Sequence, residues 1–182
     1  MKKLLLIFAV AALSMSHALA GESYTATAIG KVDGIEKKVK ATITIDRFST
    51  QPEKDEARAA LNAGGTTSLA AKLNSMPVVG KLIFEDGRAF DLKLTNQIVT
   101  LGGGRFLTVI TAKPISFLGA DKPGSKPTEG FGVGVIDLSL QADGRGKGTA
   151  APAAKVKIGD TGGFQVEDYG SKTIWLEDVR KI

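Results

Sequence analysis

The alternation of apolar and polar residues is the most regular pattern in this chain. In the segment 38–46 (KVKATITID), apolar residues fill every second position, and lysine, threonine or aspartate fills the positions between them. A period of two residues with one polar face predicts a half-buried strand of an antiparallel sheet. Related patterns predict further strands over residues 24–32, 79–85, 89–94, 105–112, 131–141, 154–159, 164–167 and 173–179.

Glycine marks the connections between these runs. Asp86-Gly87 and Asp143-Gly144 each separate two runs, which predicts β-hairpins. We expect Gly102–Gly104 to be a plain loop and Gly144–Gly148 to be a flexible turn, because neither has the surroundings of a phosphate-binding loop. The apolar parity switches between Val135 and Ile136, so we expect either a bulge there or a strand whose two halves face different layers.

A helical section interrupts the strands at about residues 50–76. Thr50 and Glu53 have the spacing of a capping box, which starts a helix. Gly64-Gly65 predicts the end of that helix and the start of a second one. We therefore predict an αα-hairpin that covers the sheet through three apolar residues at helical spacing, Leu69, Leu73 and Met76.

About nine short strands with one inserted helical hairpin place the chain in the α+β class, with a mainly antiparallel sheet. We expect this sheet to be strongly curved, and the pattern leaves open whether it closes into a barrel or stacks as a sandwich. No internal repeat or long linker divides residues 21–182, which predicts a single domain.

Residues 1–20 have the pattern of a cleavable secretory signal. Lys2 and Lys3 precede an apolar run over residues 4–13, and Ala18-Leu19-Ala20 forms a small-x-small cleavage site. The apolar run is about half as long as a membrane span, so we expect no transmembrane segment in the mature chain. These features predict export to the periplasm or the extracellular space.

Composition narrows the chemistry of the exported domain. Loss of Lys2 and Lys3 lowers the formal net charge from +5 to +3, and this small charge does not favour a nucleic-acid partner. The chain has no cysteine, and its one histidine, His17, lies in the predicted leader. Nucleophile–histidine pairs and thiolate or imidazole zinc sites are therefore excluded from the mature domain. We assign it no catalytic residue, no cofactor and no metal.

Five segments spread over most of the chain carry a family resemblance. They read DRFST-x-x-EKDEARAALNAGGTTSLAAKL from Asp46, PVVGKL from Pro77, TAKPISF at 111–117, IDLSLQADGRGKG at 136–148 and DYGSKTIWLEDVRK at 168–181. Together they resemble a family of exported bacterial proteins of unknown function. The resemblance implies export and a single domain, and it brings no activity, ligand or catalytic residue with it.

Three aromatic residues, Trp175, Tyr169 and Phe117, are the candidate ligand contacts. Trp175 has the opposite parity to Ile174 and Leu176, so its indole faces away from that apolar pair. Either the indole stacks on a sugar or an apolar ligand, or the helical hairpin covers it, and we favour the cover. Phe117 is either a ligand contact or a loop anchor.

Carboxylates offer an alternative chemistry, because glycoside hydrolysis needs only two acids at a suitable separation. The adjacent pairs Glu85-Asp86, Glu167-Asp168 and Glu177-Asp178 lie at expected strand ends or turns, where solvated charges are common. Asp91 and Asp137 alternate with apolar residues, and we place both on the solvent side of the sheet.

We expect the chain to be an exported, non-enzymatic binding or envelope-associated module with a glycan or a small apolar ligand. The alternatives are a carboxylate-dependent glycan hydrolase and a structural or interaction protein of the cell envelope. The absence of histidine and cysteine from residues 21–182 favours the binding module.

We predict cleavage between Ala20 and Gly21. The intact mass of the exported protein should correspond to a chain that begins at Gly21, because a signal peptidase reads the small residues at positions 18 and 20. Recovery of Met1 in a membrane-associated form of the protein would contradict this prediction.

Overall fold

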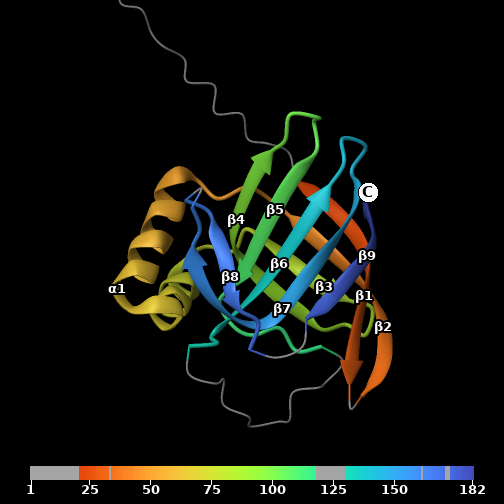
Figure 1. The fold of residues 1–182 in the computed structure, drawn as a ribbon, viewed down its shortest axis with the longest axis horizontal. Helices are drawn as coiled ribbons and strands as arrows, with labels where there is room; N and C mark the ends of the chain where they lie inside the picture. The colour runs from red at the N-terminus through yellow and green to blue at the C-terminus, as the bar shows by residue number, and fades with distance from the viewer. Residues whose placement is uncertain (1–20, 33, 118–129, 161, 171–172) are drawn as a thin grey trace, which may run out of the picture.

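The computed structural model describes residues 21–32, 34–117, 130–160, 162–170 and 173–182, which form nine strands and one helix (Figure 1). The predicted leader and most of the expected loop between Lys122 and Gly130 lie outside the described residues. The helix α1 (Gln51–Ser75) lies between the second and third strands. The strands are β1 (Glu22–Val32), β2 (Ile35–Ile45), β3 (Gly80–Phe84), β4 (Ala89–Val99), β5 (Arg105–Thr111), β6 (Val133–Leu140), β7 (Arg145–Ile158), β8 (Phe164–Asp168) and β9 (Ile174–Lys181).

The sheet closes into a barrel. Its order is β6-β5-β4-β3-β2-β1-β9-β7-β8, and β7 also pairs with β6, so that eight strands form a closed ring and β8 extends it along the edge of β7. All of the strand pairings are antiparallel. The predicted curved, mainly antiparallel sheet is thus confirmed, and the structure shows it to be a barrel.

The barrel interior is filled with side chains. Every second residue of β2 from Val39 to Ile45 faces inward, as the alternation predicted. Larger side chains, including Tyr24, Leu107 and Leu138, complete this inner cluster, and none of the three is more than 1% exposed. An interior packed in this way is a hydrophobic core.

A second apolar cluster lies outside the barrel, beneath α1. Leu69 and Leu73 are fully buried against outward-facing residues of β4 to β7, among them Val133 and Val135. Ile136, the next residue of β6, belongs to the inner cluster. This explains the switch of parity. At the start of β6 the helix buries the outer face of the strand, so apolar residues lie on that face there and on the inner face from Ile136 onward.

The structure assigns one helical element, α1, to the region where an αα-hairpin was predicted, and this element is broken in its middle. The backbone leaves helical geometry only at Gly64 and Gly65, where Gly65 has a φ of 64°, and it then continues as helix. The two glycines divide α1 into two arms, and Lys72 Nζ on the second arm lies 2.5 Å from Glu56 Oε2 on the first, so the two arms lie beside each other. Just after the kink, the buried Thr66 hydroxyl accepts a hydrogen bond of 2.9 Å from the Val156 N–H and so attaches α1 to β7.

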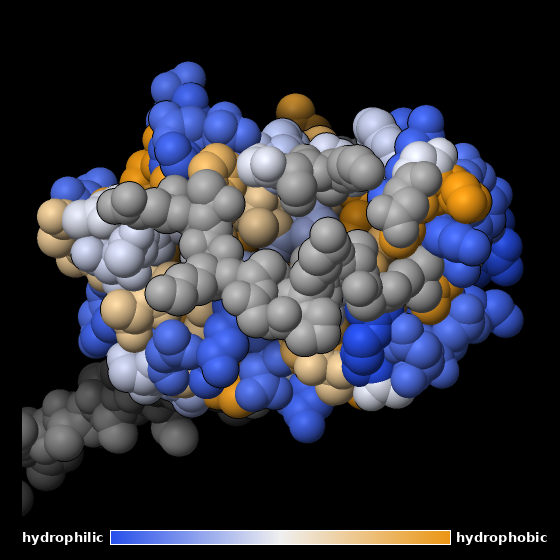
Figure 2. All heavy atoms as spheres, turned by 90° about the horizontal axis from the view of Figure 1, so that it is seen from below, coloured by the Kyte–Doolittle hydropathy of each residue, from blue (hydrophilic) through white to orange (hydrophobic). Residues whose placement is uncertain are grey.

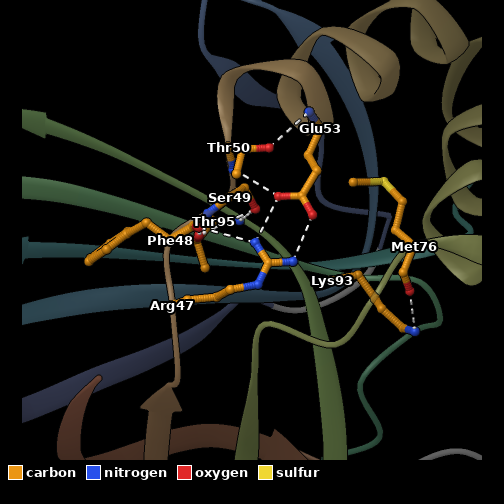
Figure 3. Close-up of polar contacts among 8 residues, drawn as sticks. All are labelled: Arg47, Phe48, Ser49, Thr50, Glu53, Met76, Lys93 and Thr95. Carbon is orange, nitrogen blue, oxygen red and sulfur yellow. Dashed lines mark hydrogen bonds and ion pairs between the residues drawn. The ribbon is translucent and has the colours of Figure 1, made fainter. Parts of the chain in front are cut away.

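Polar contacts attach the start of α1 to β4 (Figure 3). The predicted capping box is confirmed: Thr50 Oγ1 accepts from the Glu53 N–H, and the Glu53 carboxylate accepts from the Thr50 N–H at 2.8 Å. Arg47 donates to both carboxylate oxygens of Glu53, at 2.8 and 2.6 Å. The buried Ser49 and Thr95 exchange two hydrogen bonds, Ser49 N–H to Thr95 Oγ1 at 2.7 Å and Thr95 N–H to Ser49 Oγ at 2.9 Å.

The same strand holds the other end of the helix. Lys93 Nζ donates to the Met76 carbonyl at 2.9 Å, immediately after the last helical residue (Figure 3). Lysine suits this position because the last carbonyls of a helix lack partners within the helix. Both ends of α1 are therefore fixed on β4, and this limits how much of the barrel the helix can cover.

The structure corrects the expected flexible turn at Gly144–Gly148, where only the first residue lies before β7. A Cβ atom at Gly146 or Gly148 would collide with the backbone of β6, so glycine permits close pairing of the strands here. Farther along β7, the pairing with β6 shifts register around Pro152, which marks a bulge. The second half of the strand then bends away, pairs with β8 and lies beside α1 (Figure 1).

No helix within the described ranges is both long enough and apolar enough to cross a membrane. Seen from below, the described surface is mainly hydrophilic around its periphery, with smaller hydrophobic areas between the hydrophilic groups (Figure 2).

We predict that Leu73→Ala lowers the free energy of unfolding by about 2–5 kcal/mol, because the Leu73 side chain is fully buried where α1 packs on the barrel. Asn74→Ala, at the adjacent exposed position, is the matched control and should change the stability little. Urea unfolding of the three proteins measures the difference. A loss below about 0.5 kcal/mol for Leu73→Ala would mean that the helix contributes little to the core.

Candidate ligand groove on the outer face of the barrel

The outer face of the barrel is covered at one end and open at the other. On β4, the outward Leu94 lies under α1, whereas Asn96 and Ile98, farther along the strand, line an open groove. On β6, the outward Val135 is covered, whereas Asp137 and Ser139 line the same groove. The groove therefore continues the apolar surface that the helix occupies.

This outer groove has a volume of about 760 Å³, within the usual size range of small-molecule sites. The barrel wall forms its floor, and β8 with the residue that follows it contributes to one side. Its lining side chains come from six strands and one connection: Asn96, Ile98, Phe106, Thr108, Asp137, Ser139, Lys147, Thr149, Phe164, Gln165, Val166, Tyr169, Trp175 and Glu177.

The strand register arranges the groove floor in two transverse rows. The first row is polar with an aromatic end, and consists of Asn96, Thr108, Asp137, Thr149 and Trp175 on β4, β5, β6, β7 and β9. The second row is more apolar at its β4 end, and consists of Ile98, Phe106, Ser139 and Lys147. Neighbouring strands are about 4.8 Å apart, so the first row spans about 19 Å.

Four large side chains of the groove are unusually exposed. The exposed fractions are 59% for Trp175, 53% for Phe106, 46% for Ile98 and 38% for Tyr169. Clustered exposed aromatic residues are typical of binding surfaces. The favoured interpretation that helices cover Trp175 is wrong, because α1 is fixed on β4 and packs over the other end of the outer face.

Asp137 lies in the middle of the polar row and is partly buried there. Thr108 and Thr149 are directly opposite it on the two neighbouring strands, and the Thr108 hydroxyl donates a 2.6 Å hydrogen bond to its carboxylate. Burial raises the pKa of Asp137, and the Thr108 hydrogen bond only partly offsets this effect. The expectation that Asp137 lies on the outer face is met, but this part of the outer face is a groove floor rather than open solvent.

The structure brings two of the three candidate ligand contacts together. Trp175 and Tyr169 both line the groove. Phe117 is separate from them: it is 5% exposed, lies in the inner cluster of the barrel and packs edge-on against Phe84 at a centroid distance of 6.1 Å. A Cβ atom at Gly30 would collide with the Phe117 ring, which shows how closely the chain passes over this side chain.

The acids do not form an obvious catalytic pair. Of the six acids in the adjacent pairs considered from the sequence, Glu177 is the one that lines the groove, as Asp137 also does. Glu177 lies on β9, two strands from Asp137 and in the neighbouring row, so the two backbones are about 12 Å apart. Within the described residues, no group of three or more acids is placed to hold a metal ion.

Sequence reasoning did not identify Phe106, Ile98 or Asp137 as site residues. Each of them occupies an outward position of an alternating strand, where an exposed side chain is ordinary. The missing information was the pairing of β4, β5, β6, β7 and β9, which aligns these positions in adjacent rows.

Comparison with known proteins found no matching family model, no similar curated protein and no similar solved structure. The resemblance to exported bacterial proteins of unknown function therefore stays a prediction.

We predict that Asp137→Asn stabilises the protein increasingly as the pH rises. Because burial raises the folded-state pKa, the unfolded chain ionises first, so the wild type loses stability from about pH 4 upward through the pKa of Asp137. The asparagine variant lacks this loss, and the two proteins should converge at lower pH. Urea unfolding over a pH series measures the effect, and Asp91→Asn on the exposed part of β4 is the control. A stability difference that does not change with pH would contradict the prediction.

Proposed function

We propose that this chain is a non-catalytic binding module that holds a small ring-bearing molecule, a sugar or an apolar compound, in the outer groove. The observation that carries the proposal is the convergence of exposed Trp175, Phe106 and Tyr169 on one groove of about 760 Å³. Leaving large aromatic surfaces in water is unfavourable, and a ligand ring that stacks on them removes that surface from water.

The polar row gives the groove a second property. Asn96, Thr108 and Thr149 supply hydrogen-bonding groups beside the aromatic residues. A ligand with one apolar face and several hydroxyl or amine groups matches this arrangement better than a purely apolar one. Hydrogen bonds of this kind fix the orientation of a ligand, while burial of apolar surface supplies most of its affinity.

The alternative of a glycan hydrolase has weaker support. Asp137 has the raised pKa that a general acid needs, but its neighbours across both strand pairings are threonines. A retaining hydrolase places its two carboxyl groups about 5 Å apart and an inverting one about 6.5–9.5 Å apart. Among the described acids that line the groove, Glu177 is the partner available to Asp137, and it lies two strands away in the neighbouring row.

The place of action follows from the leader predicted over residues 1–20. We propose that the module works after export, in the periplasm or outside the cell. An envelope-associated or structural role through strand pairing is the second alternative, and barrel closure leaves little open sheet edge for it.

We predict that Trp175→Ala and Phe106→Ala each weaken ligand binding by at least about tenfold, because each removes an aromatic surface of the groove. Ile83→Ala is the control, since Ile83 is 40% exposed on β3 and does not line the groove. A panel of small aromatic alcohols and amines and of short β-linked oligosaccharides serves as the probe. Binding is measured by NMR shift perturbation in all variants and by the fluorescence of Trp175, the one tryptophan of the chain, where it is present.

The proposal fails if no member of the panel perturbs the groove residues at millimolar concentration. It also fails if ligands bind and the two groove variants weaken them no more than Ile83→Ala does.

A further inference from the structure

Asp137 differs from the other partly or fully buried acids for which a pKa shift is resolved. Glu22, 9% exposed, has Arg105 Nη2 and Lys181 Nζ each 2.9 Å from its carboxylate. Burial raises the pKa of Glu22, but hydrogen bonds from Tyr24, Lys181 and Arg105 outweigh it, so that the net shift is downward.

Glu53 follows the same rule. Arg47 binds both of its oxygens, and this lowers the pKa of Glu53 to about 2 against a smaller opposing effect of burial. Where this fold removes a carboxylate from water near the helix or at the end of the barrel, it supplies a cation.

Within the described part of the chain, Asp137 has no such cation. Its side-chain partner is the neutral Thr108 hydroxyl, and among the described residues no lysine or arginine nitrogen lies within 4.0 Å of its carboxylate. A partly buried carboxylate without a cation is unfavourable, and the balance is restored either by a proton or by a positive charge from outside the protein.

We infer that the outer groove binds ligands that carry a protonated amine, with Asp137 as the counter-ion and the aromatic residues as the contact for the ring. The inference rests on the proposed function and specifies the ligand chemistry of that same site. Two kinds of molecule share this chemistry, an arylalkyl amine and an amino sugar.

The spacing in the groove suits such a molecule. Trp175 is two strand positions from Asp137 in the same row, a backbone separation of about 10 Å, and Phe106 is on the adjacent strand β5, one position diagonal to Asp137. A ring placed against either aromatic side chain leaves a short linker or a neighbouring sugar unit to carry the amine to the carboxylate. The aromatic faces also favour a nearby cation.

Among the described residues that line the groove, the other charged ones are Lys147 on β7 and Glu177 on β9, each in the row next to that of Asp137. Tyr169 adds a phenol at the side formed by β8. The two acids outnumber the one lysine, and both Lys147 and Glu177 are exposed, so solvent screens them more than it screens Asp137. The attraction for a cation is therefore centred on Asp137.

Two matched pairs of probes test the inference. Each pair replaces amine by hydroxyl: 2-phenylethylamine against 2-phenylethanol at one position, and the β-1,4 glucosamine tetramer against cellotetraose at one position in every sugar unit. We expect the wild type at about pH 7 to bind the amine of at least one pair about tenfold or more tightly than its neutral partner. The pair that shows the preference identifies an arylalkyl amine or an amino sugar as the source of the amine.

2-Phenylethylamine, which stays protonated throughout this range, should bind more tightly as the pH rises from about 4 to 7, because the ionised form of Asp137 binds it, while 2-phenylethanol should not gain affinity. Asp137→Asn should abolish the preference for the amine and leave the neutral probe bound. Glu177→Gln, which removes the exposed acid of the same groove, should retain most of the preference. NMR shift perturbation gives the affinities, and Trp175 fluorescence confirms that the probe is in the groove.

Equal binding of amine and neutral probes, or a preference that survives in Asp137→Asn, would overturn the inference while leaving the proposed groove intact. If Glu177→Gln loses the preference and Asp137→Asn retains it, the counter-ion is Glu177 and the inference is also overturned. If neither member of either pair perturbs the groove at millimolar concentration, the inference is overturned. The proposed binding function fails as well if the wider panel of ring compounds is also silent.

Discussion

The bend in β7 determines where the outer groove of this molecule lies. A strand has two edges, and β6 occupies one edge of β7, while β9 and then β8 share the other along its length. The first half of β7 closes the barrel, whereas the second half, beyond the bulge near Pro152, leaves the ring with β8. Without that departure β8 would have no place beside the barrel, and the outer face of β5 to β9 would be a plain convex surface without a side wall.

The division of the outer face follows from how α1 is fixed. Its start is bound to β4 through Ser49 and Thr95, and its end through Lys93. A helix attached at both ends to one strand buries only the apolar patch beneath it. Since the barrel interior is already filled with side chains, the part of the outer face that the helix leaves open is the surface that offers both aromatic and polar groups to the proposed ligand.

Local sequence patterns predicted the helices and strands well, and they predicted the contacts between these elements poorly. The alternation in β2 and the capping box at Thr50 depend on neighbours within a few residues, and both predictions are confirmed. The Gly64-Gly65 kink, the strand conformation of Gly146 and Gly148, and the exposure of Trp175 depend on what packs against each segment. A glycine pair predicts a break in a helix, but the angle between the two arms depends on what each arm packs against, which the sequence pattern does not contain.

The same limit explains why Asp137 was placed in open solvent. Its outward position on β6 was predictable, but its environment depends on Thr108 and Thr149 across two pairings, and on the nearby β8. Glu22 and Glu53 show that carboxylates elsewhere in this fold acquire arginine or lysine partners when they lose water. A carboxylate that loses water without such a partner costs stability, and stability alone would favour a neutral residue at position 137. A bound cation in the groove would offset that cost only while the site is occupied, which makes the unfavourable environment of Asp137 in the free protein a source of binding energy for an amine.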